Sequence, residues 1–280
     1  MEVTKRLSEY IVNLKFSDLP RDVVKGAKLC FLDWLGVTLS GSKEPLTHIL
    51  SAVAEEQGGK PQATLIGRKK KVSLLQAALI NGGASHALDF DDVHLGMMGH
   101  PSAPVFPAIL ALGEWKKITG EQFISAFIAG FEAECRVSSI VYPEHYLCGW
   151  HATGTLGHFG AAAACANLLG LSPSQTVYAL GIAGTQSSGI KQVFGTMCKP
   201  FHAGKAAMNG LLAALRRRKV LPPPPICWRE RRDSPRFSPR VWTRPRPWTV
   251  WGRISPSGES SSNATPPASR PTRQSMPCWP

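Results

Sequence analysis

The chain has 280 residues, which is enough for one large domain or two modest domains with a sizeable buried core. Its formal net charge of +13 is typical of proteins that bind nucleic acid or membrane surfaces, but most of that charge follows Leu215. Residues 216–280 hold 14 of the 32 Lys and Arg residues and only 3 of the 19 Asp and Glu residues. The body before them is therefore close to neutral, which excludes a basic nucleic-acid-binding fold.

The cysteines and the N-terminal segment indicate the compartment. The seven cysteines are an odd number, and no pair has the Cys-x-x-Cys spacing of zinc or redox sites, so we expect free thiols in a reducing environment. Residues 1–16 lack the continuous apolar stretch of a signal peptide, and no run of about 18 apolar residues predicts a membrane span. We predict a soluble cytoplasmic protein with no membrane partner.

The first part of the body is predicted to be helical, because apolar residues recur every three or four positions. Three apolar stripes follow one another, from Leu7 to Leu14, from Val23 to Trp34 and from Leu46 to Ala54. The pair Gly58-Gly59 ends the third helix, and residues 63–67 form a short β-like segment.

The helical pattern continues to the end of the body. Further helices are expected at 73–81, ending at Gly82 and Gly83, at 107–117, beginning with Pro107, at 121–138 and at 206–215. Ser172 and Gln175 have the spacing of a capping box and predict a helix start. The Ala- and Gly-rich segment 157–166 predicts a buried central helix, because small residues let helix backbones approach closely. The fold class is therefore all-α.

The tail, residues 216–280, has a different composition. It contains 14 of the 23 prolines, and few of its residues can build an apolar core, so we predict a disordered, basic segment. Lys outnumbers Arg 14 to 4 in the body, whereas Arg outnumbers Lys 13 to 1 in the tail. This reversal inside a regular helical pattern favours a change of reading frame near residue 216. The alternative is a natural basic tail that binds RNA.

The densest polar cluster lies between Ser85 and Ser102. Three carboxylates and three imidazoles fall within fifteen residues: His86, Asp89, Asp91, Asp92, His94 and His100. Glycines and a proline break regular structure there, so we predict a functional loop between two helices. The alternative is a solvated acidic turn. A metal site is not favoured, because neither an EF-hand pattern nor His-Glu-x-x-His is present.

Two later segments add candidate ligands for anions. His151 precedes small residues at a predicted helix start, where the positive end of the helix dipole favours a carboxylate. Lys199 to Lys205 is predicted to be a turn that carries two lysines and His202. Taken alone, a single His or Lys in such a place is more often structural.

The order of these segments resembles a known family. The string His86-Ala87-Leu88-Asp89-Phe90-Asp91-Asp92, followed by His100-Pro101-Ser102, resembles the signature of the MmgE/PrpD family. The segments 151–157 and 199–207 resemble its next two blocks, and the resemblance covers about residues 5–215. It implies a large helical domain, here incomplete, and a smaller α+β domain that is not recognisable in the tail.

The resemblance also implies an activity. The family includes 2-methylcitrate dehydratase and cis-aconitate decarboxylase, which act on small polycarboxylic acids without a metal or another cofactor and are usually homodimers. The positions that match its catalytic residues are Asp89, His100, His151 and Lys199. Weaker substrate-binding candidates are Ser102, Thr153, His202 and Lys205.

We therefore predict a lyase acting on a citrate-like acid by dehydration or decarboxylation. Lys199 and His151 are expected to hold substrate carboxylates, and His100 with Asp89 to transfer protons. Two alternatives remain: a catalytically inactive, truncated fragment of such an enzyme, and an RNA-binding protein that acts through its tail.

Overall fold

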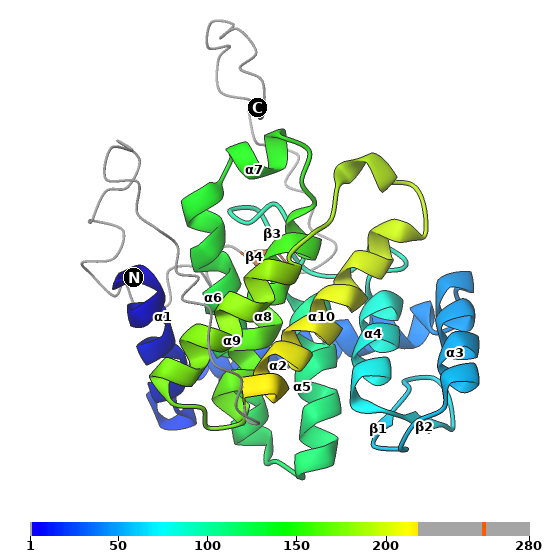
Figure 1. Ribbon diagram of the computed structural model, residues 1–280, viewed down its shortest axis with the longest axis horizontal. Helices are drawn as coiled ribbons and strands as arrows, with labels where there is room; N and C mark the ends of the chain where they lie inside the picture. The colour runs from blue at the N-terminus through cyan, green and yellow to red at the C-terminus, as the bar shows by residue number, and fades with distance from the viewer. Residues whose placement is uncertain (1, 218–253, 256–280) are drawn as a thin grey trace, which may run out of the picture.

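A computed structural model describes residues 2–217 and 254–255. The body is almost entirely helical, as predicted (Figure 1). Its elements, in chain order, are α1 (Glu2–Asn13), η1 (Phe16–Asp18), α2 (Arg21–Gly41), α3 (Pro45–Gln57), β1 (Ala63–Thr64), β2 (Lys71–Val72), α4 (Leu74–Ser85), β3 (Val93–His94), α5 (Ser102–Lys116), α6 (Gly120–Val141), α7 (Glu144–Leu147), α8 (Ala152–Leu168), α9 (Pro173–Gln186), η2 (Lys191–Val193), α10 (Cys198–Arg217) and β4 (Ile254–Ser255).

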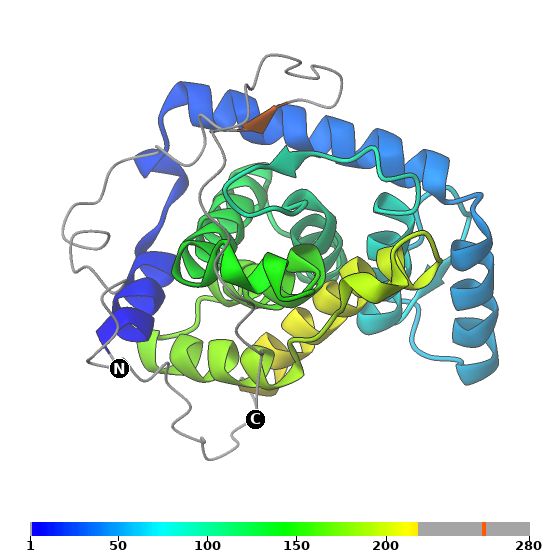
Figure 2. The ribbon, with the colours of Figure 1, turned by 90° about the horizontal axis from the view of Figure 1, so that it is seen from above.

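Helix α8 is the centre of the body. Every residue from Ala152 to Ala166 is buried, and the helix contacts α1, α5, α6, α9 and α10. Seen from above, α2 runs along one side of this bundle and α9 along the opposite side (Figure 2). The expectation of a buried central helix at 157–166 is confirmed, because its glycines face close neighbours: a Cβ at Gly157 would lie 2.6 Å from Pro104 Cγ.

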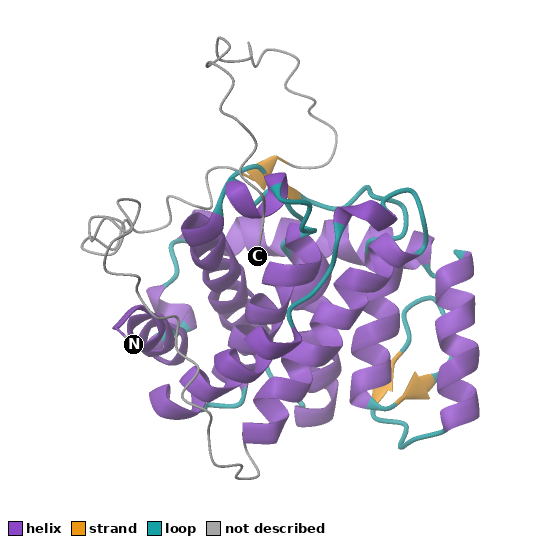
Figure 3. Ribbon diagram, turned by 45° about the horizontal axis from the view of Figure 1, so that its top comes forward, coloured by secondary structure: helices purple, strands orange, loops and turns teal. Residues whose placement is uncertain are grey.

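The two short strand pairs lie outside this bundle. Strands β1 and β2 pair antiparallel, Ala63 with Val72, in a hairpin between α3 and α4 (Figure 3). The β-like segment predicted at 63–67 thus contains β1. Strand β3 pairs antiparallel with β4, Val93 opposite Ser255.

Two predicted helix boundaries are wrong. Gly82 and Gly83 do not end α4, which continues to Ser85, because Gly82 lies against α10: a Cβ there would be 2.7 Å from Gly204 Cα. Pro107 does not begin α5, which starts five residues earlier at Ser102 and contains Pro107 in its interior. In both cases packing against neighbouring helices outweighs a local helix-breaking preference.

The predicted cap is confirmed. The Ser172 hydroxyl accepts a hydrogen bond from the Gln175 backbone N–H, and the Gln175 side chain accepts one from the Ser172 N–H, which together start α9. The same reciprocal pattern starts α6, between Thr119 and Gln122.

The tail is described at only a few positions. Helix α10 continues two residues past the boundary expected at 215, and Ile254–Ser255 form strand β4 within the segment predicted to be disordered. The rest of that prediction concerns residues 218–253 and 256–280, which lie outside the described residues. Within 2–217 and 254–255, no helix is long and apolar enough to cross a membrane.

Candidate active site

Two helix N-termini and one loop build the site. The loop that joins α4 to α5, residues 86–101, is hereafter the site loop. His151 is the N-cap residue of α8, and Lys199 lies in the first turn of α10. The segment from Lys199 to Lys205 is therefore helical, and the predicted turn there is wrong: Gly204 is needed for close packing, since a Cβ at Gly204 would lie 2.2 Å from the Leu79 carbonyl oxygen.

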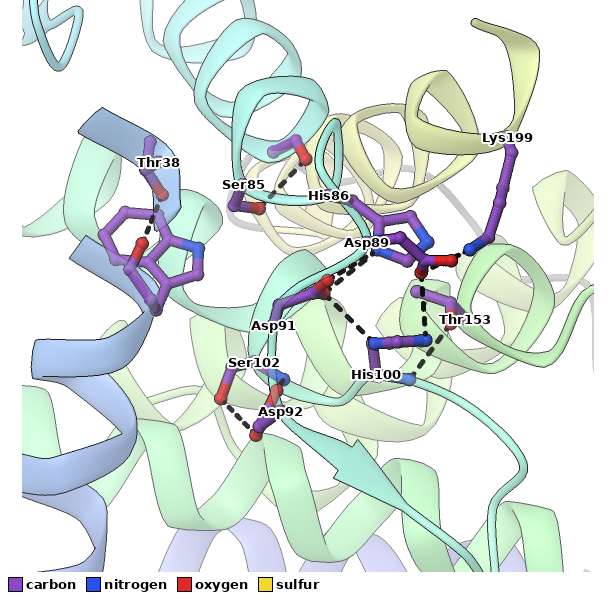
Figure 4. A network of polar contacts seen from close by, with 12 residues as sticks. Thr38, Ser85, His86, Asp89, Asp91, Asp92, His100, Ser102, Thr153 and Lys199 are labelled. Carbon is purple, nitrogen blue, oxygen red and sulfur yellow. Dashed lines mark hydrogen bonds and ion pairs between the residues drawn. The ribbon is translucent and has the colours of Figure 1, made fainter. Parts of the chain in front are cut away.

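Asp89 joins two of the predicted catalytic side chains (Figure 4). The Lys199 ammonium forms an ion pair with Asp89 Oδ1, and His100 Nε2 lies 3.6 Å from the same oxygen. Asp89 has a φ of +54°, a left-handed conformation that turns the site loop sharply here. Loop and helix thus bring together residues that are more than one hundred positions apart.

Asp91 joins two imidazoles beneath this pair. Its carboxylate accepts a hydrogen bond from Nδ1 of His86, at 3.0 Å, and lies 3.4 Å from Nδ1 of His100. Asp91 and His86 are both buried, and the His86 and His100 ring centroids are 4.6 Å apart. The other ring nitrogen of His86, Nε2, is buried and has no hydrogen-bond partner among the described residues.

His151 completes the group of rings. Its ring lies parallel to that of His86 at 5.7 Å and edge-on to Phe194 at 5.0 Å. The Lys199 ammonium lies 5.3 Å from the Phe194 ring centroid. All four predicted catalytic residues therefore gather around one point.

The weaker candidates support this group. Thr153 Oγ1 accepts a hydrogen bond from the His100 backbone N–H at 3.0 Å, and Ser102 donates from Oγ to Asp92 at 2.7 Å. His202 forms a hydrogen bond with His151, and the Lys205 ammonium donates to Ser188 Oγ. In this structure Thr153 and Ser102 serve to hold the site loop.

The adjacent loop carboxyl groups of Asp91 and Asp92 have pKa values shifted in opposite directions. Burial alone would raise the pKa of Asp91, but the His86 and His100 imidazoles outweigh it and hold that pKa far below its usual range. Burial raises the pKa of Asp92 to about 7, with the Asp91 charge adding to it and the Ser102 hydrogen bonds opposing it. The pKa of Asp89 is lowered: burial opposes this, but the Lys199 hydrogen bond and charge prevail.

The pKa values of the His100 and His151 imidazoles are shifted in opposite directions. Burial would lower the pKa of His100, but the Asp91, Asp89 and Asp92 carboxylates raise it above its ordinary value. For His151, burial lowers the pKa to about 2, and the nearby His86, His202, Lys199 and His100 side chains add to this effect. The carboxylates thus favour the charged form of His100, whereas His151 is neutral at neutral pH. The expectation that His151 holds a carboxylate then requires a neutral N–H donor rather than a cation.

The same side chains offer oxygen and nitrogen atoms to a metal. One atom each of His86, Asp89, Asp91 and His100 lies within 4.8 Å of the others. In this structure the carboxylates instead face the His100 ring from two sides, Asp91 at Nδ1 and Asp89 at Nε2.

His86 and Asp91 belong to the candidate site in the structure, although the sequence-based assignment did not include them. Both lie in the motif His86–Asp92, and their hydrogen bond to each other and their contacts with the His100 ring distinguish them from other polar residues of the loop. The sequence feature that could have indicated this pair is the His-x₄-Asp spacing. A spacing alone does not show that the two side chains are buried or that they contact each other.

Comparison with known proteins identifies the family. The family model described as the MmgE/PrpD N-terminal domain matches residues 5–220. The chain belongs to the MmgE/PrpD family. The site described above is therefore that of an MmgE/PrpD N-terminal domain, and the resemblance stated from the motifs is confirmed.

The chain is also similar to curated proteins named as cis-aconitate decarboxylases or as a protein like them. The chain is 34% identical over 222 residues to the cis-aconitate decarboxylase-like protein oryM of Aspergillus oryzae, covering 76% of this chain and 46% of that protein. It is 33% identical over 222 residues to the cis-aconitate decarboxylase of Aspergillus terreus and 30% identical over 218 residues to that of Homo sapiens, in each case covering 76% of this chain and 45% of the relative. The chain thus spans less than half the length of these relatives.

Proposed function

We propose that this chain is a lyase of the cis-aconitate decarboxylase type, acting on a citrate-like polycarboxylic acid. The observation that carries the proposal is the convergence of Lys199, a charged His100 and their shared carboxylate Asp89 at one point. Two cations close together match a substrate with several carboxylates. The similarity to relatives named as cis-aconitate decarboxylases supports this substrate class.

Lys199 and the helix N-termini would bind the substrate. A carboxylate that approaches Lys199 replaces Asp89 as its ionic partner, and the first turns of α8 and α10 add their positive dipole ends. Asp89 is 56% exposed and can move aside, whereas Lys199 is largely buried and stays. His151, when it donates through a neutral N–H, would hold a second carboxylate.

His100 would supply the proton. In a decarboxylation, the bond between a substrate carbon and its carboxylate breaks, carbon dioxide leaves, and the electron pair remains on the carbon. Protonated His100 gives its proton to that carbon, and the neutral ring is then reprotonated from water. For a dehydration, Asp89 or neutral His100 would instead take a proton from carbon. The C–H electron pair would form the double bond to the neighbouring carbon, whose C–O bond would break, and the hydroxyl would leave as water after taking a proton from solvent. Neither route calls for a metal or another cofactor, so we propose a cofactor-independent enzyme. We also propose a cytoplasmic location, which the free thiols of Cys30, Cys135 and Cys165 favour.

A second candidate function follows from the coverage of the relatives. Because the chain spans about 45% of their length, we also consider that it binds the polycarboxylate without converting it. We further expect the homodimer implied by the family for the intact enzyme.

The test uses the full 280-residue chain with cis-aconitate and 2-methylcitrate. Calorimetry measures binding, and proton NMR follows loss of substrate and appearance of product. Binding with turnover supports the lyase, and binding without turnover supports the second candidate. If neither acid binds at millimolar concentration, both proposals are wrong.

Substitutions at the site sharpen this test. Lys199→Met and His100→Asn should each lower turnover by about 10²-fold or more, because one removes a carboxylate partner and the other removes the proton donor. Lys69→Met is the matched control, since Lys69 is an exposed lysine in the turn between β1 and β2. If the chain only binds, Lys199→Met should weaken binding while Lys69→Met leaves it unchanged.

A further inference from the structure

His151 and His202 form a pair that the proposed chemistry does not explain. Nδ1 of His151 lies 3.1 Å from Nδ1 of His202, which is hydrogen-bond distance. His151 is buried at the start of α8, and His202 lies on the second turn of α10. Since His151 uses Nδ1 for this contact, only its Nε2 remains for a ligand.

The backbone leaves room specifically for the His202 ring. A Cβ at Gly154 would lie 2.9 Å from His202 Cβ, and one at Gly189 would lie 3.0 Å from His202 Nδ1. Gly189 also has a φ of +152°, and its carbonyl accepts a hydrogen bond from the His151 backbone N–H at 3.0 Å. Gly189 therefore binds the His151 main chain through its carbonyl and, because it lacks a side chain, leaves space for the His202 ring.

The hydrogen bond requires that one of the two facing nitrogens carries a hydrogen and the other does not. Two N–H groups would repel each other, and two lone pairs would form no bond. The surroundings keep both rings neutral: burial lowers the pKa of His151, with His86, His202, Lys199 and His100 adding to it. Burial likewise lowers the pKa of His202, with Lys205 and His86 adding to it. One neutral ring is thus the donor and the other the acceptor.

We propose that His202 is a positioning residue that donates from Nδ1 to Nδ1 of His151 and so fixes the tautomer of His151 with its hydrogen on Nε2. A carboxylate can only accept hydrogen bonds at neutral pH, so it binds His151 only if Nε2 carries the hydrogen. The opposite tautomer would present a lone pair to an anion. The direction of this hydrogen bond, and with it the tautomer, rests on the proposed function, because the expected ligand is a carboxylate; the contact between the two rings does not. His202 then acts through His151 rather than as a substrate ligand.

The experiment is nitrogen NMR of the full chain labelled with ¹⁵N-histidine, in which protonated and unprotonated ring nitrogens have distinct shifts. His151→Gln identifies the His151 signals among the eight histidines. In the unmutated chain at pH 7.5, His151 should carry its hydrogen on Nε2. Finding it on Nδ1 overturns the proposal without any variant of His202 and without any assay of turnover.

Two nearly isosteric variants test the cause. His202→Asn retains an N–H donor and should keep the His151 tautomer, whereas His202→Asp can only accept when ionised and should move the hydrogen to Nδ1 or leave the ring doubly protonated. An unchanged His151 tautomer in folded His202→Asp overturns the proposal. With cis-aconitate, His202→Asp should weaken binding by about 10-fold or more, and His202→Asn by less than about 3-fold. If the tautomer moves as expected but neither acid binds the unmutated chain, the proposed function fails while the positioning role stands.

Discussion

At the scale of single residues, Asp91 and Asp92 show how neighbours in sequence acquire opposite roles. Both are buried, but Asp91 contacts two imidazoles and Asp92 contacts the Ser102 hydroxyl and backbone N–H. The pKa of Asp91 is accordingly lowered and that of Asp92 raised to about 7. The negative charge at Asp91 is the largest of the carboxylate contributions that raise the pKa of His100.

Replacing Asp91 by Asn tests this dependence. The charge of Asp91 raises the pKa of His100, so Asp91→Asn should lower it, and the charged form of His100 should disappear at a lower pH than in the unmutated chain. Proton NMR titration of the His100 ring measures the change. Turnover at pH 7 should fall by about 10-fold or more, because less of the proton donor is present.

Asp92→Asn is the matched control for that experiment. Asp92 does not contact the His100 ring, and its raised pKa leaves it only partly charged at pH 7. Its replacement should therefore lower the pKa of His100 much less than Asp91→Asn does. Equal effects of the two substitutions would refute the assignment of Asp91 as the carboxylate that contributes most to the raised pKa of His100.

At the scale of elements, the contact between α4 and α10 sets the position of Lys199. Gly82 and Gly204 face each other there, and a Cβ at Gly204 would lie 2.2 Å from Leu79 O and 2.8 Å from the Gly83 backbone nitrogen. These neighbours are backbone atoms, which cannot move away from an added methyl group as easily as the end of a flexible side chain can. The two helices lie this close because both residues are glycine.

Gly204→Ala should therefore destabilise the chain by about 1–3 kcal/mol, since the added methyl group must push the helices apart. Gly36→Ala is the matched control: Gly36 is exposed in α2, and a Cβ there meets nothing within 4 Å. That substitution should stabilise by about 0.5–1 kcal/mol through helix propensity. Denaturant unfolding of both variants measures the difference, and opposite signs are expected. A stabilising effect of Gly204→Ala would contradict the close packing.

At the scale of the whole molecule, a buried histidine links the central helix to α10. His158 donates from Nδ1 to the Gly154 carbonyl at 2.6 Å and accepts at Nε2 from Asn209 at 3.2 Å. Burial lowers its pKa to about 4, with the Gly154 hydrogen bond opposing this and Lys205 adding to it. The folded chain therefore holds this ring neutral where the unfolded chain, with an ordinary pKa near 6.5, is protonated.

The sign of the resulting pH dependence follows directly. Below about pH 6.5 the unfolded state binds a proton that the folded state does not, so His158 reduces stability as the pH falls, and the loss is complete below the folded pKa of about 4. Between pH 7 and pH 4.5 this loss amounts to about 2 kcal/mol.

His158→Gln removes the titrating group from both states. The variant is expected to be less stable than the unmutated chain at pH 7, where it loses fitted hydrogen bonds, and to regain about 2 kcal/mol relative to it at pH 4.5. Denaturant unfolding at the two pH values measures this difference, in which the contributions of the other buried groups cancel. A difference that does not change with pH would contradict the neutral state of His158.

The sequence by itself determined the family, the helical class and the capped starts of helices such as α9. Those features depend on residue spacing along a few turns, which is local: apolar periodicity, the Ser172–Gln175 cap and three motifs in order. It also named Asp89, His100, His151 and Lys199, because their motifs match as strings of residues.

Only the tertiary structure decided how those residues work. The continuation of α4 through Gly82 depends on Gly204 in a distant helix, and the charge of His100 depends on which carboxylate faces it. Likewise, only the folded structure shows that His86 and Asp91 belong to the site and that His202 is the partner of His151, because these contacts form where the site loop packs against the starts of α8 and α10. Burial and ring orientation are properties of contacts between segments far apart in the chain, and for this reason local spacing could not specify them.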